Sequence, residues 1–111
     1  MINSSVKIVI PDGNKKYLFD KNEIKFIKSD RYYVNIFCLN RKVLIRITMK
    51  RLEQLLPSDF LRINKSIIVN SSFIVRIEET KSSCCIVISD EIEQQVTEKY
   101  KPIFDDYFSL I

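Results

Sequence analysis

The pattern of hydrophobic and polar positions predicts a chain built mostly from short β-strands. Segments rich in β-branched and aromatic residues recur, several of them alternate between apolar and polar positions, and polar or turn-forming residues separate them. The predicted strand segments are residues 6–10, 15–19, 24–30, 32–39, 42–48, 60–64, 67–69, 73–79, 84–89 and 92–96. The short connections leave no room for crossover helices, so the strands are expected to pair in an antiparallel manner.

Two connections carry specific turn signals. In residues 11–14, Pro11 is placed at the first corner and is followed by Asp-Gly, a pair that tolerates positive φ. Asn40 and Arg41 are expected to form a two-residue turn, because Asn adopts the left-handed conformation more readily than most residues.

The period changes to that of a helix at two places. After Thr48, a predicted N-cap, the hydrophobic residues Met49, Leu52, Leu55 and Leu56 fall on one helical face, and Pro57 ends the segment. This pattern predicts a short amphipathic helix of about two turns that packs on the core.

A second helix is predicted at the end of the chain. Thr97 is a candidate cap, but Pro102 places the start of the regular helix nearer Lys101. The helical stripe consists of Tyr100, Ile103, Phe104, Tyr107, Phe108 and Ile111. This stripe is expected to pack on a sheet face, and a surface for a partner protein is the alternative.

Length and composition indicate one ordinary domain over residues 1–111, with residues 1–14 a less certain extension. The hydrophobic content of 46% is enough for a core. No apolar run approaches the roughly 18 residues of a membrane span, and the N-terminus lacks the features of a signal peptide. A cytoplasmic location is therefore expected. The odd cysteine number, Cys38, Cys84 and Cys85, without CxxC spacing, indicates buried thiols rather than disulfides.

The composition argues against an enzyme. The chain has no histidine and one glycine, so it lacks the commonest general base and metal ligand and has no glycine-rich phosphate loop. Neither a metal nor a cofactor is expected.

The charge is unevenly distributed along the chain. Residues 1–65 carry 14 Lys/Arg and 6 Asp/Glu, a balance of +8, whereas residues 66–111 carry 4 and 8, a balance of −4. This asymmetry suggests that one side of the molecule meets an anionic partner, although a solvated, lopsided surface would explain it equally well.

The segment FLRINKSIIVN, residues 60–70, resembles the signature of the LytTR domain, the DNA-binding domain of many bacterial response regulators. The residues that match the family pattern are Phe60, Arg62, Lys65, Ser66, Ile68, Val69 and Asn70. Asn64 stands where the family usually has histidine. Residues 24–37, 46–63 and 92–108 resemble three other parts of the family pattern in the right order, so the resemblance covers roughly residues 15–108.

The resemblance implies a mainly β fold, an elongated set of small antiparallel sheets with one short central helix and a C-terminal helix. It implies that loops, rather than a recognition helix, enter two successive major grooves of double-stranded DNA. It further implies that the domain binds repeated half-sites as a pair, and a homodimer on DNA is a candidate form of that pair.

Three loops of this chain correspond to the family's DNA contacts. The predicted DNA-binding residues are Lys28, Arg31 and Tyr32 in the first loop, Arg62, Asn64, Lys65 and Ser66 in the second, and Lys99 and Lys101 in the third. Their side chains can bind phosphates or base edges. Alternatively, Asn64 and Ser66 only cap a turn. Glu98 stands where the family commonly has arginine, and its carboxylate would repel phosphates.

Two functions follow from the sequence. The first is a sequence-specific transcription regulator domain that binds DNA. The alternative, motivated by Glu98, the small net charge and the last aromatic stripe, is a LytTR-like interaction module with weakened DNA binding and a regulatory partner protein. The 111 residues leave no room for a receiver domain, which would have to lie in a longer chain.

Overall fold

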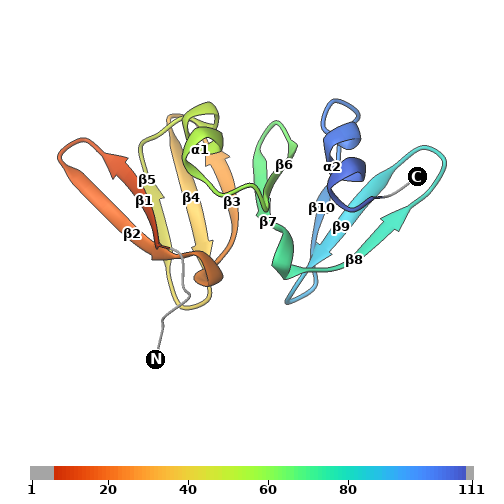
Figure 1. Cartoon of the computed structure of the whole chain (residues 1–111), viewed down its shortest axis with the longest axis horizontal. Coiled ribbons are helices and arrows are strands. Elements are labelled where there is room, and N and C mark those ends of the chain that lie inside the picture. The colour runs from red at the N-terminus through yellow and green to blue at the C-terminus, as the bar shows by residue number, and fades with distance from the viewer. Residues whose placement is uncertain (1–6, 110–111) are drawn as a thin grey trace.

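The computed structural model describes residues 7–109 and arranges its strands in three antiparallel sheets (Figure 1). The first sheet is a hairpin of β1 (Lys7–Asp12) and β2 (Lys15–Asp20). The central sheet has the order β5-β4-β3-β7-β6, with β3 (Ile24–Asp30), β4 (Tyr33–Cys38), β5 (Lys42–Ile45), β6 (Phe60–Asn64) and β7 (Ile67–Asn70). The third sheet has the order β10-β9-β8, with β8 (Ile74–Glu79), β9 (Cys84–Ile88) and β10 (Ile92–Gln95). The predicted mainly β, antiparallel fold is confirmed.

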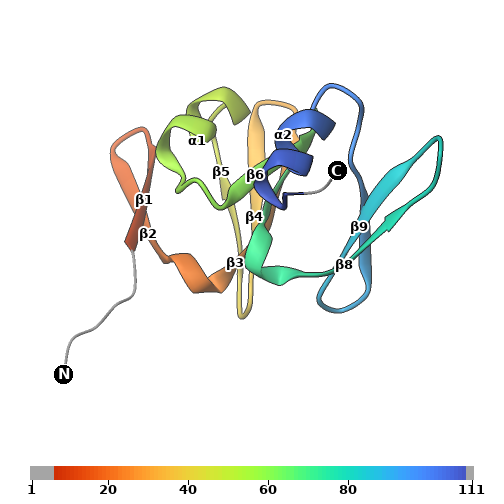
Figure 2. The same ribbon diagram turned by 45° about the vertical axis from the view of Figure 1, so that its right-hand side comes forward.

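Two short α-helices and two 3-10 turns complete the described part of the chain. They are α1 (Met49–Leu55), α2 (Lys101–Tyr107), η1 (Lys21–Glu23) and η2 (Ser71–Phe73). Figure 2 shows both α-helices at the same end of the molecule; α1 contacts β1, and α2 contacts β6 of the central sheet. Within residues 7–109, neither helix is long and apolar enough to cross a membrane.

The central sheet separates two hydrophobic cores. One face packs against the β1–β2 hairpin and α1, and the other face packs against the third sheet and α2. In β7, Ile68 belongs to the first core whereas Ile67 and Val69 belong to the second, because successive side chains of a strand point to opposite faces. The uninterrupted apolar run in this strand therefore results from burial on both faces of the sheet.

The predicted turns in the first half of the chain needed correction. β1 continues through Pro11 to Asp12, and the turn is Gly13-Asn14, with Gly13 at a φ of 59°. The β4–β5 connection spans Leu39 to Arg41, with the Cys38 amide donating to the Arg41 carbonyl at 2.8 Å. Because Phe37 pairs with Lys42, the two-residue turn consists of Leu39 and Asn40, one residue earlier than predicted, and Asn40 does not have a positive φ.

The strand predicted over 42–48 ends at Ile45. The Arg46 amide leaves the β4 ladder and donates to a carboxylate oxygen of Asp12 at 3.3 Å, which redirects the chain toward α1. The other strand ends differ from the predicted ones by at most two residues, and Val6 lies outside the described residues.

The central helix is as predicted. The Thr48 hydroxyl accepts a hydrogen bond from the Arg51 amide at 3.1 Å, and Met49 and Leu52 are buried. The last helix begins at Lys101, as Pro102 required, but the Thr97 side chain does not cap it: the Thr97 carbonyl accepts from the Tyr100 and Lys101 amides.

The stripe on α2 is only partly buried. Phe104 is in the core and Phe108 packs against it, whereas Ile103 and Tyr107 are exposed. Ile111 lies outside the described residues. The helix thus packs on the sheet through half of its apolar stripe.

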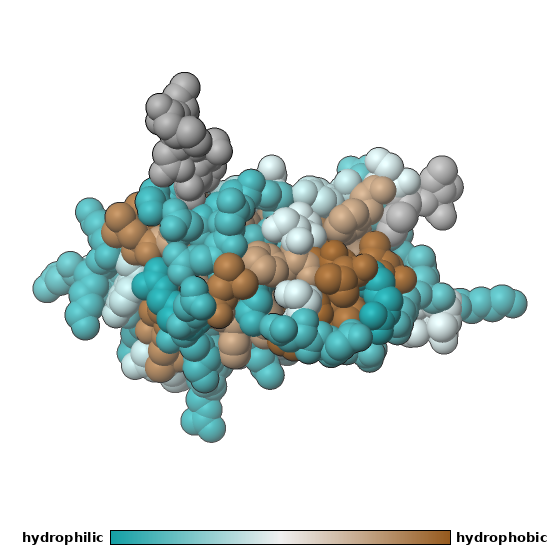
Figure 3. Space-filling view, turned by 90° about the horizontal axis from the view of Figure 1, so that it is seen from below, coloured by the Kyte–Doolittle hydropathy of each residue, from teal (hydrophilic) through white to brown (hydrophobic). Residues whose placement is uncertain are grey.

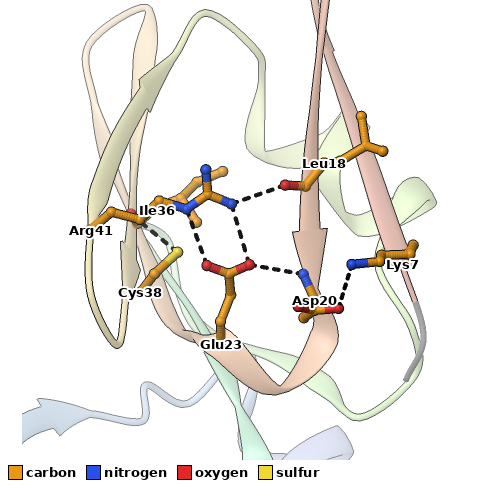
Figure 4. Close-up of polar contacts among 7 residues, drawn as sticks. All are labelled: Lys7, Leu18, Asp20, Glu23, Ile36, Cys38 and Arg41. Carbon is orange, nitrogen blue, oxygen red and sulfur yellow. Dashed lines mark hydrogen bonds and ion pairs between the residues drawn. The ribbon is translucent and has the colours of Figure 1, made fainter. Parts of the chain in front are cut away.

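A polar network closes the end of the molecule opposite to α1 (Figure 4). Arg41 donates to both carboxylate oxygens of Glu23 at 3.1 and 3.2 Å and to the Leu18 carbonyl at 2.9 Å, and its guanidinium lies 4.7 Å from the centre of the Phe19 ring. The Asp20 amide donates to Glu23 at 2.9 Å. The bonds from Arg41 lower the pKa of Glu23 below its usual value. Arg41 therefore joins the β4–β5 connection to the first hairpin.

Hydrophilic side chains cover much of this end (Figure 3). Viewed from this end, apolar patches lie between the charged side chains, with the larger ones on the side of the third sheet (Figure 3). Among the large hydrophobic side chains, Leu39 and Val75 are 56% and 59% exposed. The β3–β4 and β6–β7 turns, which carry Arg31 and Lys65, lie at the other end (Figure 1).

Candidate nucleic-acid interface

One edge of the central sheet gathers all three loops that the sequence assigned to DNA binding. β3 ends and β4 begins there, joined by the Arg31-Tyr32 turn, and β6 ends and β7 begins there, joined by the Lys65-Ser66 turn. The segment between β10 and α2 lies beside β6 at the same edge, which is the upper edge in Figure 1. Three segments distant in sequence therefore form one row.

Main-chain hydrogen bonds connect the three segments. The Ser29 amide donates to the Ser66 carbonyl at 2.9 Å, and the Thr97 amide donates to the Ile63 carbonyl at 2.9 Å. The second bond is possible because a bulge between Arg62 and Asn64 removes Ile63 from the regular β6–β7 pairing. The relative positions of the loops are thus fixed by the backbone.

The first turn presents cations and an aromatic ring to solvent. Arg31 adopts a φ of 59°, a left-handed conformation that is energetically unfavourable for a residue with a Cβ atom. Tyr32 is 75% exposed, and Lys28 is exposed at the base of the turn. Within residues 7–109, neither Arg31 nor Lys28 forms an ion pair, so both charges are available to an anion.

The second turn exposes the Lys65 ammonium on a backbone that side-chain hydrogen bonds hold in place. Asn64 accepts from the Ser66 amide at 2.8 Å and donates to the Gln95 carbonyl at 2.8 Å, so its amide caps the turn and connects it to β10. Lys65 is exposed at the tip and has no ion-pair partner in the described range. Lys65 is therefore exposed at the tip of the turn, and Asn64 holds the turn in place through hydrogen bonds.

Arg62 lies behind this turn rather than at its tip. Its guanidinium donates to Glu53 at 3.0 Å and to the Lys65 carbonyl at 2.7 Å, and it stacks 5.5 Å from the centre of the Tyr100 ring. The side chain is 18% exposed, and its buried Nε has no partner. Arg62 thus joins α1, the second turn and the third segment.

The two lysines of the third segment differ in their surroundings. Lys101 is bound by Asp105 at 2.7 Å and Glu79 at 2.6 Å, and these two carboxylates raise the pKa of its ammonium. Lys99 has no ion pair within the part that the structure describes, and its ammonium lies 5.4 Å from the centre of the Tyr100 ring. Glu98 is exposed between Lys99 and Thr97. Lys99 is therefore the cation that this segment offers.

Comparison with known proteins identifies the family. The profile of the LytTr DNA-binding domain matches residues 14–109. This chain belongs to the LytTR family. The matched range contains all nine predicted DNA-binding residues, and β1, which precedes it, pairs with β2 inside it.

A solved structure has the same fold as this LytTR domain. It is described as the LytTr DNA-binding domain of a methyl-accepting/DNA response regulator from Bacillus cereus, with a TM-score of 0.77 and 18% sequence identity. The alignment covers 97% of this chain and 99% of that one. A comparison with curated proteins found no match. The chain thus belongs to a family of DNA-binding domains and shares its fold with this solved structure.

Sequence reasoning did not select two residues that the fold brings to this edge. Tyr100 lies between the cations of Arg62 and Lys99, and its position in the helical stripe suggested only packing. Arg46 lies 5.8 and 6.0 Å from the ring centres of Tyr32 and Tyr33. It lies in the strand predicted over residues 42–48, which in fact ends at Ile45. No local sequence signal marks either pairing, because both depend on tertiary contacts.

Proposed function

We propose that this LytTR domain recognises specific DNA sequences by inserting its cationic loops into the major groove. The observation that supports the proposal is the row of Arg31, Lys65 and Lys99, three exposed cations on segments joined by main-chain hydrogen bonds. Arg and Lys read guanine edges or bind phosphates, and a fixed backbone holds them at set spacings.

The size of the molecule fits contact with two successive grooves. Its longest dimension is 46 Å. Successive major grooves on one face of B-DNA are separated by about 34–36 Å. The molecule as a whole is therefore long enough to extend over two successive grooves.

We further propose that the domain binds repeated half-sites as a pair and acts in a response-regulator setting. The support is the membership of the LytTR family together with the described role of the Bacillus cereus protein of the same fold. In a longer chain or a complex, a receiver domain or partner would supply the signal.

The test begins with selection of bound duplexes from a random DNA library, which should return a repeated motif. Lys65→Met should then weaken binding to the selected duplex about tenfold or more, and less to random DNA, if Lys65 reads a base. Lys42→Met is the matched control, because Lys42 is an exposed cation beside an aromatic ring at the opposite end of the sheet. A binding constant that does not change with salt would exclude the DNA-binding proposal for this chain.

The second candidate function is an interaction module controlled by a partner protein. One support is α2, where Ile103 and Tyr107 remain 68% and 42% exposed. The other is Glu98, an exposed carboxylate in the third segment that would repel DNA phosphates. Gel filtration separates the two functions. A tight dimer that buries α2 and does not shift DNA would favour the interaction module.

A further inference from the structure

A concavity of about 410 Å³ lies between the β3–β4 turn and the segment that leads into α1. Arg31, Tyr32 and Tyr33 line it from the turn, and Arg46 and Thr48 line it from the other side. It adjoins the interface on the side away from Lys65, because β5 is the outer neighbour of β4 in the sheet. None of the predicted contacts uses Arg46.

Arg46 is held in place without being neutralised. Its main-chain amide is fixed by Asp12, and its guanidinium lies within 6.0 Å of the centres of two tyrosine rings. Such cation–π contacts orient a guanidinium while leaving its five N–H donors free. Among the ion pairs of residues 7–109, none involves Arg46 or Arg31. Two uncompensated guanidinium groups thus line one concavity.

The position of Arg46 suits the edge of a DNA groove. Neighbouring strands are about 4.8 Å apart, so Arg46 at the end of β5 stands about 7 Å from the middle of the β3–β4 turn. The major groove is about 12 Å wide, so its phosphates lie about 6 Å from its centre line. When the turn enters the groove, Arg46 is placed over the sugar-phosphate backbone that borders it.

We propose that Arg46, together with Arg31, binds one backbone phosphate of double-stranded DNA in this concavity. This inference rests on the proposed function, since it assumes that the β3–β4 turn enters a groove. Tyr32 and Tyr33 act as positioning residues that keep the Arg46 guanidinium extended toward the phosphate. The contact adds affinity and orientation and carries no base specificity.

The experiment compares Arg46→Met with Lys42→Met. Both variants remove one positive charge from β5 or its end; Arg46→Met removes two cation–π contacts and Lys42→Met removes one. Lys42 lies at the far end of the strand, about 13 Å away. Binding to the selected duplex and to a random duplex of equal length is measured by fluorescence anisotropy between 50 and 200 mM salt.

The expected result for Arg46→Met is a loss of about 0.9 from the magnitude of the log-affinity against log-salt slope. Affinity should fall roughly three- to tenfold, equally for both duplexes. Lys42→Met should leave the slope unchanged. Arg46→Lys, which keeps the charge, should restore the slope, and it serves as the readout should Arg46→Met fold poorly.

The outcomes distinguish this inference from the proposed function. If wild-type affinity depends on salt and Arg46→Met has the same salt slope and affinity as Lys42→Met, the phosphate site is overturned and the proposed function is not. A loss confined to the selected duplex would make Arg46 a base contact and also overturns it. A wild type with no salt dependence overturns both proposals.

Discussion

Arg62 donates a 2.7 Å hydrogen bond from its guanidinium to the main-chain carbonyl of Lys65. The same guanidinium binds Glu53 on α1 and stacks on Tyr100 before α2. A residue that the sequence suggested as a DNA contact therefore also holds the main chain at Lys65 in place. The structure gives Arg62 a positioning role, independent of any contact with DNA.

Arg62→Met is expected to weaken DNA binding through the conformation of Lys65. The variant removes the bond to the Lys65 carbonyl and should lower DNA affinity about fivefold or more, with a stability loss of about 1–2 kcal/mol. Arg62→Lys should not restore the affinity, because an ammonium cannot bind Glu53, the carbonyl and the ring at once. Anisotropy titration and urea unfolding measure the two effects.

Glu53→Gln is the matched control for Arg62. It removes the ion pair on α1 but leaves the bond to the Lys65 carbonyl, so DNA affinity should be nearly unchanged. Equal losses of affinity in Glu53→Gln and Arg62→Met would argue against the positioning role.

Arg31→Gly should separate stability from binding. The left-handed φ of 59° costs a residue with a Cβ atom about 1 kcal/mol, and glycine avoids that cost. The variant is therefore expected to unfold at higher urea while binding DNA more weakly, because the guanidinium is lost. Arg31→Ala, which keeps the Cβ atom, should lose affinity without the gain in stability; stabilisation by alanine as well would contradict the strain at this turn.

Asn70 should be among the residues most sensitive to substitution. It is fully buried, donates to the Lys21 and Ile24 carbonyls at 3.1 and 2.9 Å, and accepts from the Ser72 amide at 3.2 Å. Asn70→Ala leaves these groups without partners and should lower the free energy of unfolding by about 3 kcal/mol. Asn40→Ala, in an exposed loop, should change it by less than about 0.5 kcal/mol in the same urea titration.

The Glu23–Arg41 pair should make stability depend on pH. The pKa of Glu23 is held below its ordinary 4.5, mainly by the hydrogen bonds from Arg41, so the pair stabilises the fold above pH 4.5. This contribution is lost as the pH falls through the lowered pKa. Glu23→Gln should therefore be less stable than the wild type by about 0.5–1 kcal/mol at neutral pH, and the difference should vanish in acid.

The control for this pH effect is Asp106→Asn, on an exposed carboxylate with no ion pair within residues 7–109. Its unfolding free energy should follow the wild type across the same pH range. A difference between wild type and Glu23→Gln that persists at pH 3 would point to lost packing rather than lost charge.

Local patterns in the sequence predicted the elements but not how their ends are used. The Leu spacing in α1 follows from burial on one face, so it could be predicted without neighbours. The alternation in β8 is interrupted instead, because the register shifts between Ile74 and Arg76 and leaves Val75 exposed. The end of β5 could not be predicted, because it depends on Asp12, 34 residues earlier in the chain. The local sequence likewise could not predict that Arg31 has a positive φ and that Asn40 does not.

The candidate site shows the same limit. The sequence indicated which residue types would be presented near residues 31, 65 and 99. Which of the cations are already occupied depends on contacts between distant segments. Lys101 and Lys99 have similar sequence surroundings, yet only Lys101 is bound by Glu79 from β8. The role of Arg62 behind its turn likewise depends on Glu53 and Tyr100.

The bonds from Ser29 to Ser66 and from Thr97 to Ile63 join main-chain atoms only. Their formation does not require any particular side chain at the tips of the loops. Residues such as Arg31, Lys65 and Lys99 can therefore be exchanged while the frame that spaces them is preserved. Under the proposed function, in which these three tips meet the DNA, a few surface substitutions there would change the target sequence and leave the frame intact.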